Sequence, residues 1–322
     1  MNPEQLQDFY QLTPDHVLDA LESVGLAPQA ALLALNSYEN RVYQFRDYDE
    51  QRFVVKFYRP NRWSDAQIIE EHQFTQELEA NEIPVVAPLT INQQTLFSHA
   101  NYRFAIYPNK GGRTPNLDDK ETLVWLGRFI GRIHLMGEAT DFKYRPTLTL
   151  QSFGHDAVNY LLAADFIPTH IQQAYQTTTQ QILEYCEIKF SRYTPQRLLR
   201  LHGDCHPSNV LWTDNGPHFV DFDDSRMGPA VQDLWMLIND AQDASQWNAI
   251  LEGYEDFREF DDREFKLIEP LRALRMLHYS AWLAQRWHDP SFQHNFGWFN
   301  TTKYWEEQVL YLKEQLYLVQ QD

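Results

Sequence analysis

Three polar residues that could do chemistry lie close together in the sequence, between His202 and Asp224. Asp204 is followed by Asn209 five residues later, and Asp221 comes twelve residues after Asn209, at the end of a short apolar run. Phosphoryl transfer from a nucleotide needs a carboxylate near the acceptor hydroxyl and oxygen ligands for Mg²⁺. A loop that carries Asp204 and Asn209, with a hairpin that returns Asp221, meets these needs.

Lys56 and Glu71 could supply a clamp for a phosphate group. Lys56 lies within an apolar run that is typical of a strand, where a buried ammonium group is costly without an acidic partner. Glu71 lies on the helix expected after this strand, and Glu70 and Glu77 share that helix. The spacing from the apolar residues of the helix favours Glu71 as the partner of Lys56.

The elements that must position these residues change in kind along the chain. A first helix is expected to begin after Thr13, a hydroxyl N-cap, and to stop near Gly25. Strands are predicted over residues 31–35, 42–45, 53–58, 84–88, 95–97 and 102–107, with a helix over 65–80 between them. Later helices are predicted over residues 117–136, 167–190, 229–239, 264–287 and 304–320, around a β-rich segment at 198–224.

This order of elements predicts an α+β, bilobal fold. The flexible polar stretch Asn109–Arg113 is the candidate hinge between the lobes. We expect an N-terminal lobe over residues 1–107, with a small antiparallel sheet, and a larger, mainly helical C-terminal lobe over residues 108–322. A cleft between two lobes is where ligands usually bind.

Composition excludes some classes of function. The chain of 322 residues carries 45 Asp and Glu against 27 Lys and Arg, a net charge of −18. This charge repels phosphate backbones and anionic lipids, so we expect binding neither to nucleic acid nor to membranes. The two cysteines, Cys186 and Cys205, are typical of a reducing compartment. With no signal-like start and no apolar run near the roughly 20 residues that span a bilayer, we expect a cytoplasmic protein. A monomer is our default expectation for the oligomeric state.

Three potential zinc ligands, His202, Cys205 and His206, flank Asp204. A zinc site needs roughly three or four such ligands, and the sequence offers no second cluster to complete one. We therefore expect structural histidines and a packed thiol at this place.

The order of these motifs resembles the protein-kinase-like fold in its phosphotransferase branch, which includes aminoglycoside, choline and homoserine kinases. The shared features are a lysine, a glutamate, H-G-D at 202–204 with an asparagine five residues after the aspartate, and D-F-D at 221–223. Residues 35–43, 53–60 and 229–237 resemble the bacterial stress response kinase A family, within a similarity that runs from about residue 13 to 305. The resemblance implies an ATP- and Mg²⁺-dependent serine/threonine protein kinase of the cytoplasm that acts in envelope and oxidative stress.

The resemblance also implies roles for the residues of the site. Asp204 matches the residue that accepts the proton of the acceptor hydroxyl, and Asn209 and Asp221 match the Mg²⁺ ligands. Lys56 matches the phosphate-binding lysine, and Glu71 matches its ion-pair partner. The implied partners are therefore ATP and a protein with a Ser or Thr acceptor.

Further residues are implied around the nucleotide. Ser37 would lie in the turn that covers the phosphates, and the backbone of residues 105–108, with Ile106 and Pro108, would contact adenine. Asp233 resembles the helix-borne aspartate that braces the catalytic loop.

Three departures from the pattern matter. The turn Asn36–Asn40 has no glycine, and Asp223 replaces the glycine of D-F-G, where it could join the metal ligands or bind backbone. Only eleven residues separate Asp221 from Asp233, which leaves no room for a long activation loop or a platform for a peptide.

Two other functions stay open. The short segment after Asp221 favours the same fold acting on a small alcohol such as an aminoglycoside, choline or homoserine. The third possibility is an inactive nucleotide-binding module, and the intact Lys56, Asp204, Asn209 and Asp221 argue against it.

Overall fold

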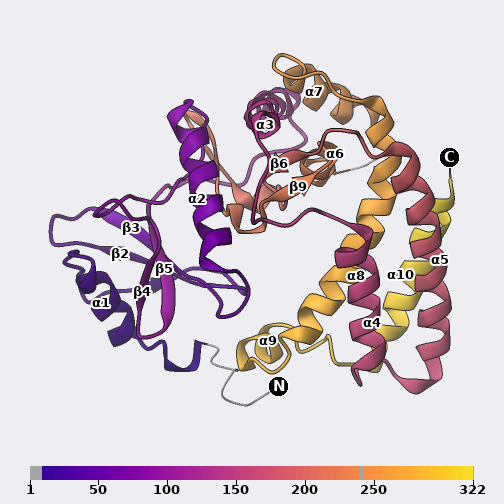
Figure 1. Cartoon of the computed structure of the whole chain (residues 1–322), viewed down its shortest axis with the longest axis horizontal. Helices are drawn as coiled ribbons and strands as arrows, with labels where there is room; N and C mark the ends of the chain where they lie inside the picture. Colours follow the sequence, from indigo (N-terminus) through magenta and orange to yellow (C-terminus); the bar gives the residue numbers. More distant parts are fainter. Residues whose placement is uncertain (1–8, 240–242, 322) are drawn as a thin grey trace.

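The computed structural model describes residues 9–239 and 243–321. Figure 1 shows a sheet-containing N-terminal lobe and a larger helical C-terminal lobe, so the predicted bilobal α+β fold is confirmed. Residues 1–8, which we included in the N-terminal lobe, lie outside the described residues.

A five-stranded antiparallel sheet with the order β1-β2-β3-β5-β4 forms the N-terminal lobe. Its strands are β1 (Leu33–Ala34), β2 (Arg41–Arg46), β3 (Arg52–Phe57), β4 (Phe97–His99) and β5 (Tyr102–Pro108). Because side chains alternate along a strand, Val55 and Phe57 are buried in the core beside α1 (Pro14–Ser23), while Lys56 faces the opposite side. The predicted N-cap of α1 is present, since Thr13 Oγ1 accepts the His16 N–H.

Helix α2 (Asp65–Ala80) occupies the predicted residues and lies between the sheet and the C-terminal lobe (Figure 1). Ser64 and Gln67 form a capping box that fixes its start. This placement buries Glu71 on the face of α2 that looks toward the inter-lobe cavity.

The strand predicted over residues 84–88 is absent. Pro84 and Pro88 bracket this apolar run, and proline has no N–H to give to a ladder. The run instead makes a single bridge from Val85 to Phe219, with Phe219 N–H donating to Pro84 O at 2.8 Å. The segment thereby joins the N-terminal lobe to the β-rich part of the C-terminal lobe.

The β-rich segment of the C-terminal lobe forms two short antiparallel pairs. Strand β6 (Leu199–Leu201) pairs with β9 (Arg226–Gly228), and β7 (Val210–Thr213) pairs with β8 (Gly216–Phe219). The short helices η4 (Pro207–Asn209) and η5 (Phe222–Asp224) lie in the connections and carry or flank the candidate site residues.

The rest of the C-terminal lobe is helical. Its helices are α3 (Lys120–Ala139), α4 (Asp156–Ala163), α5 (Thr169–Tyr193), α6 (Val231–Leu234), α7 (Ala244–Tyr254), α8 (Ile268–Gln285), α9 (Pro290–Asn295) and α10 (Thr302–Gln320), with the shorter turns η3 (Gln151–His155), η6 (Trp235–Leu237) and η7 (Asp262–Leu267). In the N-terminal lobe, η2 (Phe9–Gln11) precedes α1. The helix predicted over 229–239 is shorter than expected, because it ends in the tight turn η6.

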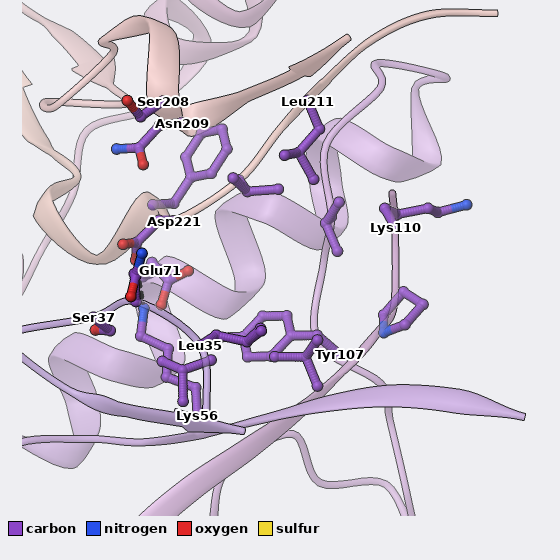
Figure 2. Close-up of a pocket in the computed structure, with 17 residues that line it drawn as sticks. Leu35, Ser37, Lys56, Glu71, Tyr107, Lys110, Ser208, Asn209, Leu211 and Asp221 are labelled. Carbon is purple, nitrogen blue, oxygen red and sulfur yellow. Dashed lines mark hydrogen bonds and ion pairs between the residues drawn. The ribbon is translucent and has the colours of Figure 1, made fainter. Parts of the chain in front are cut away.

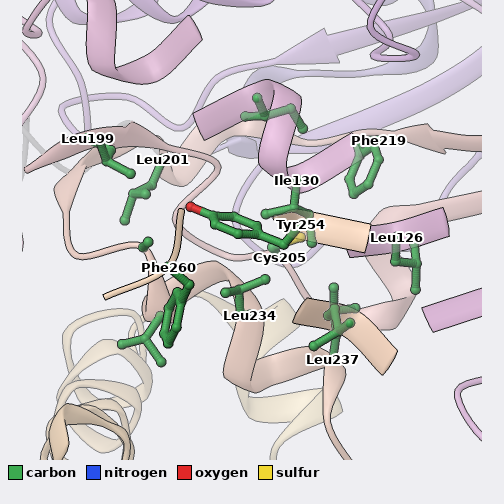
Figure 3. Packing of buried hydrophobic residues seen from close by; sticks show 14 of the residues in the cluster. Leu126, Ile130, Leu199, Leu201, Cys205, Phe219, Leu234, Leu237, Tyr254 and Phe260 are labelled. Carbon is green, nitrogen blue, oxygen red and sulfur yellow. The ribbon is translucent and has the colours of Figure 1, made fainter. Parts of the chain in front are cut away.

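The core of this lobe packs tightly against the loop that carries Asp204. Figure 3 shows Tyr254 and Cys205 surrounded by apolar side chains from several elements. The Tyr254 hydroxyl lies 3.0 Å from His134 Nδ1, which satisfies both groups inside the core. Burial raises the pKa of the Cys205 thiol well above its usual value, so the predicted packed thiol is confirmed.

Among the helices formed by residues 9–239 and 243–321, none is both long enough and apolar enough to cross a membrane.

Candidate active site

A cavity of about 340 Å³ lies between the lobes and collects most of the predicted residues. Its lining includes Ser37, Lys56, Glu71, Pro108, Asn209 and Asp221. Figure 2 shows Ser37, Lys56, Glu71, Asn209 and Asp221 toward one end of the cavity, with Leu211 and Lys110 toward the other. The cavity therefore has a polar end that suits phosphates and a more apolar end that suits a base.

Lys56 is held at the polar end by two carboxylates of the C-terminal lobe. Its Nζ lies 2.8 Å from Asp221 Oδ1 and 3.5 Å from Asp223 Oδ1. Burial works against the charged ammonium, but Asp221 and then Asp223 outweigh it and raise the pKa of Lys56 well above its usual value. The Lys56 side chain is therefore positively charged in the cavity.

Glu71 lies near Lys56 without forming the expected ion pair in this structure. No ion pair within 4.0 Å joins the two side chains among the described residues, and Glu71 Oε2 is buried without a hydrogen-bond partner there. Burial raises the pKa of Glu71 to about 7, against the weaker opposing effect of Lys56. Glu71 is therefore a buried hydrogen-bond acceptor beside Lys56, whose ammonium group is bound to Asp221 and Asp223 instead.

Asp221 and Asn209 face the cavity from adjacent connections. Asp221 has a left-handed backbone, with φ 63°, an uncommon conformation for a residue other than glycine that is often found at functional sites. Asn209 Nδ2 donates to the Asp204 carbonyl at 3.0 Å, so the side-chain amide oxygen of Asn209 could accept a bond from another group or bind a cation.

The donor set fits a magnesium ion better than a zinc ion. Within the described residues no group of three His, Cys, Asp or Glu side chains converges to hold a metal by itself. Mg²⁺ is usually bound by one or two protein oxygens together with substrate phosphates and water. Asn209 and Asp221 supply such oxygens at the polar end of the cavity.

The loop that carries Asp204 is braced from below by Asp233, as predicted. Both carboxylate oxygens of Asp233 accept backbone N–H groups at 2.8 Å, one from His202 and one from Gly203. Gly203 has φ +85°, and a Cβ there would lie 2.1 Å from the Asp224 carbonyl oxygen, so only glycine fits. This bracing fixes the direction in which Asp204 points.

Asp204 itself lies outside the cavity lining and is partly exposed. Its Oδ1 accepts a hydrogen bond of 2.8 Å from Arg275 Nη1 on α8, and its Oδ2 lies 3.4 Å from His206 Nε2. Burial opposes its ionisation, but His206 and Arg275 outweigh that effect and lower the pKa of Asp204 below its usual value. Arg275 could not be predicted as a partner of Asp204, because it lies 71 residues away in the sequence.

The glycine-free turn 36–40 is held by its own side chains. Asn40 Oδ1 accepts the Arg59 N–H at 3.0 Å, and Asn40 Nδ2 donates to Asp223 Oδ2 at 3.2 Å. Glu39 is bound at 2.7 Å by Arg286, at the end of α8. Ser37 lines the cavity from this turn, where its Oγ accepts the Asn40 N–H at 3.4 Å.

The sequence suggested that Asp223 joins the metal ligands or binds backbone, but its carboxylate contacts side chains of the other lobe. Its carboxylate binds the side chains of Asn40 and Arg62 from the N-terminal lobe and also lies near Lys56. Burial opposes its ionisation, but Lys56 and Arg62 lower the pKa of Asp223 below its usual value. Asp223 therefore links the two lobes at the polar end of the cavity.

The end of β5 forms the more apolar end of the cavity. Tyr107 and Pro108 line it, whereas the Ile106 side chain is buried in the core on the other side of the sheet. The Ile106 carbonyl already accepts the Leu89 N–H at 2.7 Å. Tyr107 and Pro108 are thus better placed than Ile106 to meet a base.

Comparison with known proteins identifies the family. The phosphotransferase enzyme family matches residues 32–268 of the chain. Stress response kinase A of Escherichia coli strain K12 is 45% identical over 316 residues, which cover 97% of this chain and 95% of that protein. The chain belongs to the stress response kinase A family, within the phosphotransferase enzyme family. It is therefore a kinase, as the sequence predicted.

A second relative carries a more specific name. The serine/threonine protein kinase RdoA of Salmonella typhimurium is 46% identical over 309 residues, which cover 95% of this chain and 93% of that protein.

Solved structures of other kinases share the fold. Amicoumacin kinase hAmiN, in complex with AMP-PNP, Ca²⁺ and Ami, has a TM-score of 0.71 at 18% identity, over 92% of this chain and 94% of that one. A microcompartment-associated aminopropanol kinase has a TM-score of 0.71 at 17% identity, over 94% and 95% of the two chains. The likeness at these identities confirms the fold alone.

Proposed function

We infer that this kinase transfers the γ-phosphoryl group of ATP, with Mg²⁺, to Ser or Thr hydroxyls of proteins. The arrangement that supports this proposal is Lys56, Asn209 and Asp221 along one cavity, with Asp204 just outside it. The relatives named stress response kinase A and serine/threonine protein kinase RdoA support a protein acceptor and a role in stress. By family resemblance, the enzyme would act in the cytoplasm in envelope and oxidative stress. A monomer is our default expectation for its oligomeric state.

The nucleotide would bind with its base against Tyr107 and Pro108 and its phosphates at the polar end, beneath the turn that carries Ser37. Asn209 and Asp221 would hold Mg²⁺, which when bound supplies positive charge to the phosphates. Lys56 would then exchange its contact with Asp221 for a phosphate oxygen. Glu71, buried beside it with an unpartnered oxygen, would hold the ammonium group in this second position.

Asp204 would orient the acceptor hydroxyl and accept its proton. The lowered pKa of Asp204 keeps the carboxylate ionised at neutral pH, so it can accept this hydrogen bond. The rigid attachment of its loop to Asp233 would supply the positioning on which phosphoryl transfer depends.

A small alcohol remains the second candidate acceptor, and one observation favours it. The residues between Asp221 and Asp233 form η5, β9 and the start of α6, and most of them are buried. This segment therefore offers little surface on which a peptide could lie.

The experiment that decides between the acceptors uses purified full-length chain, labelled ATP and Mg²⁺. One basic and one acidic protein would be offered, and separately a panel of aminoglycosides, choline and homoserine. Label on protein from the wild type, absent with Asp204→Ala, is the expected result. Label on a small alcohol alone would contradict the protein-kinase proposal and establish the second candidate.

A further inference from the structure

One face of helix α8 borders both Asp204 and the turn that covers the phosphates. Arg275 pairs with Asp204, and two turns further along the helix Trp282 Nε1 donates to Glu39 at 2.5 Å. Arg286 contacts the same glutamate. None of these three residues, two on α8 and Arg286 at its C-cap, lines the nucleotide cavity. Helix α8 therefore forms a wall beside Asp204, outside the lining of the nucleotide cavity.

Arg275 differs from the other arginines of this region. The side chains of Arg62, Arg226 and Arg286 are at most 14% exposed, and each donates to two acceptors or more. The Arg275 side chain is 44% exposed, and its bond to Asp204 is the one hydrogen bond that its guanidinium makes within the described part of the chain. Most of its five N–H donors are therefore free to bind an incoming group.

The chemistry of transfer leaves Arg275 with an unbalanced charge. As the acceptor oxygen bonds to the γ-phosphorus, the bond from that phosphorus to the ADP oxygen breaks and ADP leaves with the electron pair. The acceptor proton passes to a carboxylate oxygen of Asp204, which becomes neutral. The Arg275 guanidinium then lacks the negative charge that it faces in this structure. A carboxylate of the acceptor placed beside Arg275 would restore the pairing, with two parallel N–H···O bonds available.

The other carboxylates near Asp204 are already paired with cations, so they are not available to pair with Arg275. Asp221 is paired with Lys56, and Asp224 is paired with Arg62 and Arg226. A polycationic acceptor would instead meet the positive charge of Arg275 next to the base. Beside Arg275 on the same helix, Tyr279 is 41% exposed and stacked on Trp282, with ring centroids 5.7 Å apart, which offers an apolar surface for a peptide.

We propose that Arg275 binds the carboxylate of an Asp or Glu next to the acceptor Ser or Thr, so that the enzyme selects acidic protein segments. This inference rests on the proposed protein-kinase function and names its substrate class. Arg275 is then a specificity-determining residue of the acceptor site.

The test measures kcat and KM for three peptides that differ only beside one Ser, with Asp, Ala or Lys as neighbours. The variants are Arg275→Gln and Arg275→Glu, with Arg272→Gln as the matched control one turn earlier on α8, where Arg272 pairs with Glu269. We expect the wild type to prefer the Asp peptide over the Lys peptide by about tenfold in kcat/KM, mainly through KM. Arg275→Gln should abolish the preference, Arg275→Glu should reverse it, and Arg272→Gln should keep it.

Other outcomes overturn the inference in distinguishable ways. Equal losses of kcat for all three peptides in Arg275→Glu would mean that Arg275 only positions Asp204. Wild-type activity on peptides without charge preference would refute the inference and leave the protein kinase intact. If no peptide or protein is labelled while an acidic small alcohol is, both the inference and the proposed function are wrong.

Discussion

Two carboxyl groups of the site, Asp204 and Glu71, lie in opposite electrostatic environments. The carboxylate of Asp204 is favoured because His206 and Arg275 face it, whereas Glu71 is buried with an oxygen that has no hydrogen-bond partner among the described residues. The first arrangement suits a group that must accept a hydrogen bond from a hydroxyl. The environment of Glu71 suits a carboxyl group that binds a cation once the cation comes into contact with it. Lys56 is the nearby cation.

The raised pKa of Glu71 predicts how stability depends on pH. The folded pKa is about 7, above the ordinary 4.5, so the folded chain holds a proton that the unfolded chain releases. Stability should therefore fall as pH rises from about 4.5 to 7. Glu71→Gln removes this loss, so thermal unfolding without nucleotide should show a higher Tm than wild type at pH 8 and a smaller difference at pH 5.

Glu79→Gln is the matched control, because Glu79 is exposed on the same helix. It should track the wild type at both pH values. A Glu71→Gln variant that is less stable than wild type at pH 8 would mean that the carboxylate is ionised and paired in the nucleotide-free protein.

Residue types and spacing were enough to predict the core of the site. Lys56, Asn209 and Asp221 meet in one cavity because strand alternation and a short hairpin bring them there. Glu39 and Arg286, 247 residues apart, and Arg275 could not be predicted. Their contacts depend on how helix α8 packs against the rest of the fold, which no local pattern encodes.

At the scale of elements, side chains replace glycine in the turn 36–40. The Glu39 side chain is 12% exposed and lies among Arg59, Arg62 and Arg286. Desolvation opposes its ionisation, but these arginines lower the pKa of its carboxyl below the usual value. The turn is thereby anchored to α8 of the other lobe rather than left flexible.

Glu39→Gln should weaken this anchor. Removing one partner of a buried ionic cluster costs about 3 kcal/mol or more, so stability should fall and KM for ATP should rise because the turn no longer holds its place. Denaturant unfolding and initial rates at varied ATP measure the two effects. Glu50→Gln, at an exposed hairpin position, should change neither. If Glu39→Gln is less stable but its KM for ATP is unchanged, the anchoring of the turn does not contribute to nucleotide binding.

Helices α3 and α7 cross so closely that glycine is required. A Cβ at Gly127 would lie 1.9 Å from the Ile250 carbonyl oxygen, and a Cβ at Gly253 would lie 1.9 Å from that of Val124. Gly127→Ala must push the helices apart and should destabilise the protein by about 3 kcal/mol in denaturant unfolding. Gly111→Ala, where nothing lies within 4 Å of the new atom, should change the stability little. Equal stability of the two variants would contradict this packing.

The longest helices and most strands could be predicted from the sequence, whereas the shorter helices α4, α7 and α9 were not. Helix α2 occupies the predicted residues because its cap and apolar spacing are both local signals. The strand expected over 84–88 fails because prolines flank it, and its bridge to Phe219 joins residues far apart in the sequence. The lobe boundary between residues 107 and 108 stays a prediction.

At the scale of the whole molecule, charged contacts hold the two lobes around the cavity. Arg59 and Arg41 of the N-terminal lobe bind Asp289 at 2.9 and 3.3 Å, and Lys56 binds Asp221. The loop of Asp204 is braced from below by Asp233, and Asp204 lies outside the lining of the cavity between the lobes. We therefore propose that nucleotide binding and activation of the acceptor depend on different residues.

The most direct test measures Mg²⁺·ATP affinity and phosphoryl transfer on the same preparations of Asp204→Asn, Asp221→Asn and the control Asp214→Asn, which alters an exposed turn residue. Loss of a general base typically costs about 100-fold or more in rate. We predict such a loss of kcat for Asp204→Asn with unchanged ATP affinity, loss of Mg²⁺-dependent binding for Asp221→Asn, and wild-type behaviour for Asp214→Asn. Undiminished transfer by a folded Asp204→Asn, or an equal loss of ATP binding, would contradict the account.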